Sequence, residues 1–302
     1  MKRLGLLAIV ACSSKSPGAD HPVGARLGPA LVAALAAADH VREPWRCAAA
    51  DGPELAEEKL GDWQLSGHTL HRTGAATTTT IGVIADAGGA APITLAGLGR
   101  LRGKLANVDL VITLGGMGAT AAELAGAIGA FAGHAPIVVL AGDLEPAAAI
   151  AGLPRPMLDS RMVRRIELPG ATIVTLPGAS AASRLVPGDD GCAYRPADVT
   201  AVLADLTPRP GLRILASAEA PRAVRAGEPT GDLVLPAAEV DVVLHGPTDG
   251  TASPAQTGKR TGTAIGLTPG TSDATARIPA VKPSAGILTI RDGAWSWTPI
   301  FE

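Results

Sequence analysis

The chain has few aromatic residues and almost no net charge. Aromatic residues make up 2% of its 302 residues, and the formal net charge at pH 7 is −2. Proteins that bind single-stranded nucleic acid stack bases on aromatic rings, and proteins that bind duplexes carry basic patches. The sequence offers neither feature, so we expect no nucleic-acid partner. It also lacks an internal run of about 18 apolar residues, which excludes an internal transmembrane helix.

The N-terminal segment has the order of a secretory signal peptide. Basic Lys2 and Arg3 precede an apolar stretch over 4–11, and Cys12 follows directly. The end of this stretch, Ile9 to Cys12, resembles the lipobox of bacterial lipoproteins. This resemblance implies cleavage before Cys12, a lipid on its sulfur and anchoring to a membrane of the bacterial cell envelope, the outer membrane if the host has one. The alternative is a cytosolic protein in which the stretch is an apolar first strand and Cys12 a core thiol.

Cysteine is scarce in the rest of the chain. Only Cys47 and Cys192 remain after Cys12 is assigned to the lipid. In an exported protein an even remainder favours one disulfide, here Cys47–Cys192. If the signal-peptide interpretation is wrong, these are two unrelated buried thiols.

The sequence divides into three parts. Residues 1–11 form the lipoprotein signal peptide, residues 12–74 form a tether and an N-terminal helical and irregular segment, and residues 75–302 form the main domain. Within the second part, apolar residues at helical spacing predict a helix over 19–38. A linker-like run at 72–76 marks the start of the domain.

From residue 77 onward the pattern is that of an α/β protein. Continuous apolar strands are predicted at 77–84, 108–114 and 136–140, and a helix at 119–131 lies between the last two. Shorter strands follow at 163–168, 172–176, 213–217, 240–245, 263–267 and 286–291. Their close spacing, with glycine and proline in the turns, indicates a second sheet packed on the first.

Five of the predicted strand ends carry a recognisable pattern. They read Asp86-Ala87-Gly88, Gly115-Gly116-Met117-Gly118, Gly142-Asp143-Leu144-Glu145, Ser217-Ala218-Glu219-Ala220-Pro221 and His245-Gly246-Pro247-Thr248-Asp249. Their order and flanks resemble the calcineurin-like metallophosphoesterase superfamily over about residues 77–302. The turn Thr268-Pro269-Gly270-Thr271 is similar to the Asn-Pro-Gly-Ser turn of that family. The resemblance implies a double β-sandwich, two packed β-sheets flanked by helices, with ligands at the carboxyl ends of the strands.

The resemblance also implies that the metal centre is largely lost. Asp86 keeps the first ligand, but Gly88 stands in place of its histidine partner and Gly116 in place of the carboxylate that bridges both metals. The other departures are Asp143 for asparagine, Leu144 for the catalytic histidine, and Ala218, Pro247 and Asp249 for histidines. A two-metal hydrolase needs ions about 3.5–4 Å apart, held by such ligands. The leading interpretation is therefore a degenerate phosphoesterase domain that acts as a non-catalytic binding or structural module. A protein partner is compatible with this role.

Three carboxylates leave an enzymatic alternative open. Asp86, Asp143 and Asp249 together suit one hard divalent cation such as Ca²⁺ or Mg²⁺. With it, the chain would be a divergent metal-dependent phosphoesterase. The simpler alternative is that the three aspartates are solvated turn residues, because aspartate is common in turns.

A second alternative is a metal-free phosphate or nucleotide binder. Gly115, Gly116 and Gly118 lie between a predicted strand and a predicted helix, where backbone N–H groups bind phosphate in other proteins. Close packing equally explains these glycines. Ser217 has neither a G-x-S-x-G context nor a nearby histidine in the sequence, so serine hydrolase chemistry has no support.

Overall fold

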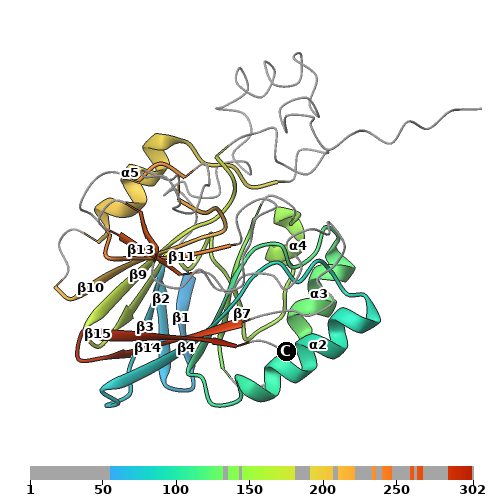
Figure 1. Ribbon diagram of the computed structural model, residues 1–302, viewed down its shortest axis with the longest axis horizontal. Helices are drawn as coiled ribbons and strands as arrows, with labels where there is room; N and C mark the ends of the chain where they lie inside the picture. The colour runs from blue at the N-terminus through green and yellow to red at the C-terminus, as the bar shows by residue number, and fades with distance from the viewer. Residues whose placement is uncertain are drawn as a thin grey trace, which may run out of the picture.

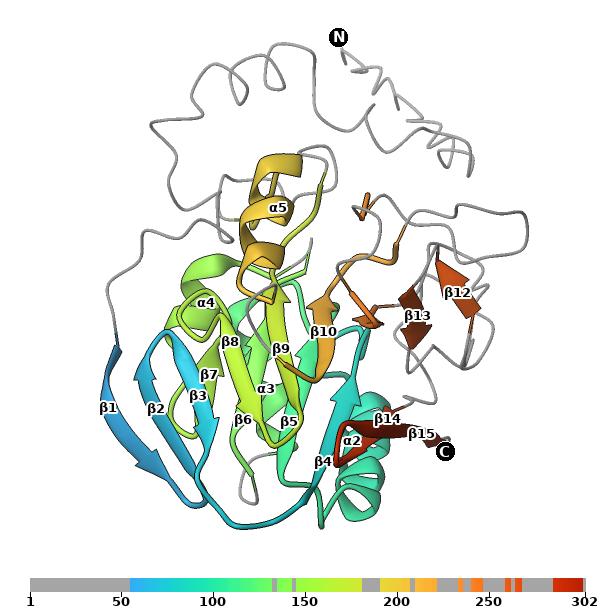
Figure 2. The same cartoon turned by 90° about the vertical axis from the view of Figure 1, so that its left-hand side faces the viewer.

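The structure is a computed structural model that describes residues 55–131, 135–142, 145–180, 191–206, 210–221, 233–235, 240–246, 259–261, 264–267 and 285–300. These residues form two β-sheets packed face to face, with helices on their outer sides (Figures 1 and 2). Within this part of the chain, no helix combines the length and apolar character that spanning a membrane requires.

The first sheet has six strands among the described residues, in the order β15-β14-β4-β5-β6-β7. Their bounds are β4 (Thr78–Ile84), β5 (Leu110–Leu114), β6 (Ile137–Leu140), β7 (Met157–Asp159), β14 (Ala285–Arg291) and β15 (Ala294–Ile300). Strands β4 to β7 are parallel, and β14 pairs antiparallel with both β4 and β15. Parallel neighbours need crossover connections, and the crossovers contain α2 (Pro92–Lys104), α3 (Ala121–Gly129) and α4 (Ala147–Ala151).

The second sheet has nine strands within the described ranges, in the order β1-β2-β3-β8-β9-β10-β11-β13-β12. Their bounds are β1 (Leu55–Leu60), β2 (Trp63–Gly67), β3 (Thr69–Arg72), β8 (Arg165–Leu168), β9 (Ala171–Leu176), β10 (Leu212–Ser217), β11 (Val242–His245), β12 (Lys259–Thr261) and β13 (Ala264–Leu267). Strands β9, β10, β11 and β13 are parallel. Helix α5 (Pro196–Ala204) precedes β10.

Three buried clusters hold these layers together. Because side chains alternate along a strand, Leu110, Ile112 and Leu114 of β5 face the second sheet, whereas Val111 faces the helices. The inner cluster fills the space between the sheets. A second lies beneath α2, α3 and α4, and a third packs α5 against β9, β10 and β11. The result is a four-layer sandwich in which helices cover both sheets.

The fold class predicted from the sequence is confirmed: the protein is an α/β fold of two packed sheets flanked by helices. The predicted strands at 77–84, 108–114 and 136–140 correspond to β4, β5 and β6. Weak alternation over 63–70 is compatible with a strand, but residues 55–72 were assigned to the helical and irregular segment. In the structure, β1 to β3 join the second sheet through parallel pairing of β3 with β8. The sheet therefore begins before residue 75, where we placed the start of the domain. The predicted helix at 19–38 and the turn at 268–271 lie outside the described residues.

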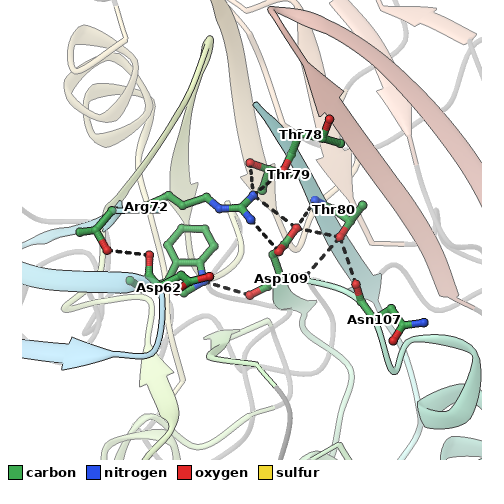
Figure 3. A network of polar contacts seen from close by, with 9 residues as sticks. Asp62, Arg72, Thr78, Thr79, Thr80, Asn107 and Asp109 are labelled. Atoms are coloured by element: carbon green, nitrogen blue, oxygen red, sulfur yellow. Dashed lines mark hydrogen bonds and ion pairs between the residues drawn. The ribbon is translucent and has the colours of Figure 1, made fainter. Parts of the chain in front are cut away.

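One polar network joins the two sheets at the amino ends of β4 and β5 (Figure 3). The guanidinium of Arg72, at the end of β3, donates to Asp109 Oδ1 at 2.7 Å and to the carbonyl oxygen of Thr78 at 2.8 Å. It also lies 5.9 Å from the ring centroid of Trp63, whose Nε1 donates to the carbonyl oxygen of Asp109 at 3.0 Å. The Arg72 side chain is only 4% exposed. This network fixes the β1–β3 unit against the first sheet.

Candidate functional site

The carboxyl ends of β4 and β5 run on beside each other past the last paired residues of the sheet. Asp86 N donates to Gly115 O at 2.9 Å, Gly88 N to Gly116 O at 2.8 Å, and Gly89 N to the carbonyl oxygen of Met117 at 3.1 Å. Parallel pairing of the two strands sets this alignment. The strand-end segments predicted to carry ligands are therefore brought together, as expected, but by their backbones.

Asp86 lies directly over Gly116. Asp86 is a non-glycine residue with a φ of 52°, in the left-handed region, and its side chain is partly exposed. A Cβ atom added to Gly116 would lie 2.7 Å from Asp86 Cα and 2.8 Å from Asp86 Oδ1. Real Cβ atoms do not approach so closely, so this position has no room for a side chain. It is the position at which the family resemblance would place the bridging carboxylate.

The other glycines of this loop also allow close packing. A Cβ on Gly115 would lie 2.8 Å from Gly142 Cα, at the end of β6. A Cβ on Gly118 would lie 2.7 Å from the backbone nitrogen of Leu124, in α3. Close packing thus accounts for each glycine of the predicted phosphate loop. Whether Gly115, Gly116 and Gly118 bind phosphate stays a prediction.

The end of β11 closes the same region from the second sheet. A Cβ on Gly246 would collide with the carbonyl oxygen of Ala218 and would lie 3.3 Å from the carbonyl oxygen of Leu114. Ala218 follows β10, and Leu114 ends β5. The carboxyl ends of strands from both sheets therefore meet backbone to backbone.

Two buried carboxylates at this edge are bound by the chain itself. Glu145 is fully buried and accepts hydrogen bonds from the backbone N–H groups of Met117, at 2.6 Å, and Gly142, at 2.8 Å. Glu219 is 3% exposed and accepts from Ser180 N at 3.1 Å and from the Tyr194 hydroxyl. Sequence reasoning did not select either as a site residue. The sequence signal that could have identified them is an acidic residue a few positions after a buried strand.

The pairing of β10 with β11 gives Ser217 a neighbour that sequence spacing does not reveal. No histidine is near Ser217 in the sequence, but the strand register places His245 directly opposite it. The two side chains are buried, and they are not coupled as a nucleophile and base. His245 Nδ1 is bonded to the carbonyl oxygen of Gly246 at 2.7 Å, and its Nε2 has no hydrogen-bond partner. Serine hydrolase chemistry therefore gains no support from this pair.

The described part of the strand-end region does not fit a two-metal centre. Among the described residues, no three histidine, cysteine, aspartate or glutamate side chains gather in a way that could hold a metal ion. The structure describes Asp86, but Asp143 and Asp249 lie outside the described residues. Binding of one cation by the three aspartates therefore stays a prediction. The space that a bridging carboxylate at position 116 would need is filled by the backbone of Asp86.

Cys192 is fully buried in the cluster beneath the helices of the first sheet. Cys12 and Cys47 lie outside the described residues. The lipid on Cys12 and the disulfide between Cys47 and Cys192 therefore stay predictions.

A cavity of about 450 Å³ lies elsewhere, at the amino ends of β9 and β10. Its walls include the turn residues Gly170, Gly211 and Gly293 and the carboxylates of Glu167 and Asp292. Because it lies at the amino ends of β9 and β10, it is at the opposite end of the second sheet from the strand-end region, and none of the predicted site residues that the structure describes lines it.

Comparison with solved structures finds general similarity at low identity. TT1561 of Thermus thermophilus is 14% identical with a TM-score of 0.48, over 73% of this chain and 98% of that one. Purple acid phosphatase PPD1 from yellow lupin (Lupinus luteus) seeds is 13% identical with a TM-score of 0.46, over 78% of this chain and 54% of that one. A Vps29 variant from Entamoeba histolytica is 11% identical with a TM-score of 0.29, over 74% of this chain and 99% of that one. Likenesses of this size carry no argument about function. No family model and no curated protein matches the chain.

Burial of His245 predicts that acid destabilises the protein. Desolvation lowers the pKa of His245 from 6.5 to about 4. The unfolded chain protonates this imidazole more readily than the folded chain does. The stability that depends on neutral His245 is therefore fully present above pH 6.5 and is lost as the pH falls toward 4. The expected loss at pH 4 is about 3 kcal/mol. Denaturant unfolding of the wild type at several pH values between about 7 and 4 measures it.

The matched variant for this experiment is His245→Asn. Its amide retains a donor for the carbonyl oxygen of Gly246 but does not titrate. Relative to the wild type, the variant is expected to lose about 3 kcal/mol less over the same pH range. Equal losses in the two proteins would show that the histidine does not carry the acid sensitivity.

Proposed function

We propose that this chain is a lipid-anchored protein of the bacterial cell envelope with a degenerate calcineurin-like phosphoesterase domain. The domain binds or supports a partner and does not hydrolyse phosphoesters. The anchor holds it at the membrane through Cys12, at the outer membrane if the host has one. In this proposal, the segment Ser13 to Gly18 joins the lipid to the rest of the chain.

The observation that carries the non-catalytic part is the contact between Asp86 and Gly116. Two-metal hydrolysis depends on ligands that hold both ions and clamp the substrate. Position 116 supplies no ligand and has no room for one. The nearby acids Glu145 and Glu219 accept hydrogen bonds from the chain's own donors. These features favour a strand-end region that serves packing.

The test is to measure bound metal and hydrolysis in the same preparation. Elemental analysis of the full chain is expected to find no stoichiometric transition metal after purification with Mn²⁺. A generic phosphodiester substrate such as bis(p-nitrophenyl) phosphate is expected to be hydrolysed no faster than in a blank containing Mn²⁺. Metal-dependent turnover that disappears in Asp86→Ala would contradict the proposal.

One observation favours the enzymatic alternative. Asp86 holds a left-handed backbone conformation, and strained non-glycine residues cluster at functional sites. With Asp143 and Asp249 it would hold one divalent cation for phosphoester hydrolysis. The turnover experiment decides between the two functions, because only this alternative predicts activity that depends on Asp86.

The anchor has a separate test. Cys12→Ser removes the thiol to which the lipid would be attached, so the variant is expected to leave the membrane fraction and accumulate in soluble extracts. The matched control is Ser13→Ala, which alters the neighbouring residue but keeps the thiol and is expected to stay with the membrane. An unchanged membrane fraction of Cys12→Ser would refute lipid anchoring at this residue.

A further inference from the structure

The carboxylate of Glu145 is buried between the ends of two parallel strands. Glu145 lies after β6 and shortly before α4, and it is fully buried. Its Oε1 accepts a hydrogen bond from Met117 N at 2.6 Å, and its Oε2 accepts one from Gly142 N at 2.8 Å. The two donors belong to the segments that follow β5 and β6. Both oxygens of one side chain thus bind backbone N–H groups from two separate loops.

Glycine at position 142 allows the carboxylate to reach this place. A Cβ on Gly142 would lie 3.0 Å from Glu145 Oε2 and 3.1 Å from Gly115 Cα. Gly115 has a φ of 83°, which a residue with a side chain rarely adopts. The two glycines bring the loops close enough for their N–H groups to converge on one anion.

Converging backbone N–H groups are a general anion-binding arrangement, and hydrogen bonds to an ionised acceptor are stronger than neutral ones. We propose that the loops after β5 and β6 form an anion-binding cradle that the chain fills with its own Glu145 carboxylate. The Met117 N–H group therefore already donates its hydrogen bond to Glu145. An external phosphate at the glycine loop would have to compete with a covalently attached carboxylate.

The cradle is distinct from an ordinary helix cap. Glu123 in α3 also accepts two backbone N–H groups, from Ala119 at 3.1 Å and from Thr120 at 3.2 Å. Those contacts are exposed, so water replaces the carboxylate when it is removed. The contacts of Glu145 are buried, and removal leaves two donors without a partner, which is costly in a protein interior.

The experiment removes the carboxylate and supplies a small one from solution. Glu145→Ala in the full chain is expected to lower the Tm by about 5–15 °C. Sodium formate at about 100 mM is expected to raise the Tm of this variant by several degrees relative to sodium chloride, because formate binds the folded state only. The wild type and Glu123→Ala are expected to respond equally to the two salts. A variant that formate does not stabilise, or a wild type that formate stabilises equally, would overturn the cradle.

Glu145→Gln keeps the proposal testable if the alanine variant does not fold. Its carboxamide retains one acceptor oxygen and turns an NH₂ group toward the second donor. The variant is expected to have a lower Tm than the wild type and to show no response to formate, since the cradle stays filled. In the wild type, the amides of Met117 and Gly142 are expected to be among the slow-exchanging hydrogens. A Gln variant as stable as the wild type, or fast exchange at both amides, would count against the cradle.

These readouts are stability and hydrogen exchange, so they are independent of the proposed function. Phosphodiesterase activity would overturn the non-catalytic proposal without affecting the cradle. Conversely, absence of formate stabilisation would leave the metal and turnover results unchanged.

Discussion

Gly116→Asp is expected to lower the free energy of unfolding by at least about 3 kcal/mol, because it adds both backbone strain and overlap. The φ of Gly116 is 70°, and its Cβ would lie 2.7 Å from Asp86 Cα. Backbone atoms cannot rotate away as a flexible side chain can. The variant restores the residue type that the family resemblance places here, yet it is expected to gain no metal-dependent activity. Denaturant unfolding and elemental analysis measure the two outcomes.

Gly61→Asp is the matched control for this substitution. Gly61 also has a positive φ, of 63°, but an added Cβ would meet nothing within 4 Å. Gly61→Asp is therefore expected to lose only the free energy of placing a non-glycine residue in the left-handed region, about 1–2 kcal/mol. The difference between the two variants isolates the overlap with Asp86. Equal destabilisation would show that position 116 has room for a side chain, and the main support for the non-catalytic proposal would be removed.

Arg72→Met is expected to cost about 2–4 kcal/mol of unfolding free energy. The substitution keeps an apolar stem of similar length but removes the donors to Asp109 and to the carbonyl oxygen of Thr78. It also removes the cation above Trp63, at 5.9 Å from the ring centroid. Asp109 keeps a hydrogen bond from Thr80 N at 2.7 Å, so the loss is smaller than for a carboxylate left without partners. Chemical denaturation measures the loss.

The control is an arginine–aspartate pair that is open to solvent. Arg213 Nη2 lies 3.0 Å from Asp241 Oδ1, and the side chains are 31% and 40% exposed. A hydrogen bond from Arg213 lowers the pKa of Asp241, but solvent screens the pair. Arg213→Met is therefore expected to cost less than about 1 kcal/mol. If both substitutions cost the same, burial of Arg72 does not strengthen the junction between the sheets.

The Gly116 and Glu145 variants test how the carboxyl ends of the strands are packed. At position 116, where the family resemblance places a bridging carboxylate, the chain has a glycine whose neighbours are backbone atoms, and Gly246 is packed against backbone atoms in the same way. Where acidic side chains are present, as at Glu145, backbone N–H groups bind them. If the experiments agree, this edge of the fold serves as a packed junction between the two sheets.

The sequence alone was sufficient for the class of fold and for the central strands of both sheets. The β-branched and apolar runs at β4, β5 and β6 are continuous because parallel strands in a covered sheet are buried on both faces. Helix α3 was predicted from another local signal, a run of helix-forming residues without proline. Local pattern also located the strand ends, since glycine-rich segments follow buried strands at Gly115 and Gly142.

The contacts among those strand ends were decided only by the tertiary structure. Pairing of β3 with β8 joins segments that are far apart in the sequence, and weak local alternation in 63–70 gave no sign of its partner. Glycine at position 116 was compatible with a phosphate loop or with close packing, and only the position of Asp86 shows that the space is filled. Glu145 likewise becomes an internal ligand only when β5 and β6 lie side by side. Local propensity depends on neighbours in sequence, whereas these contacts depend on neighbours in space.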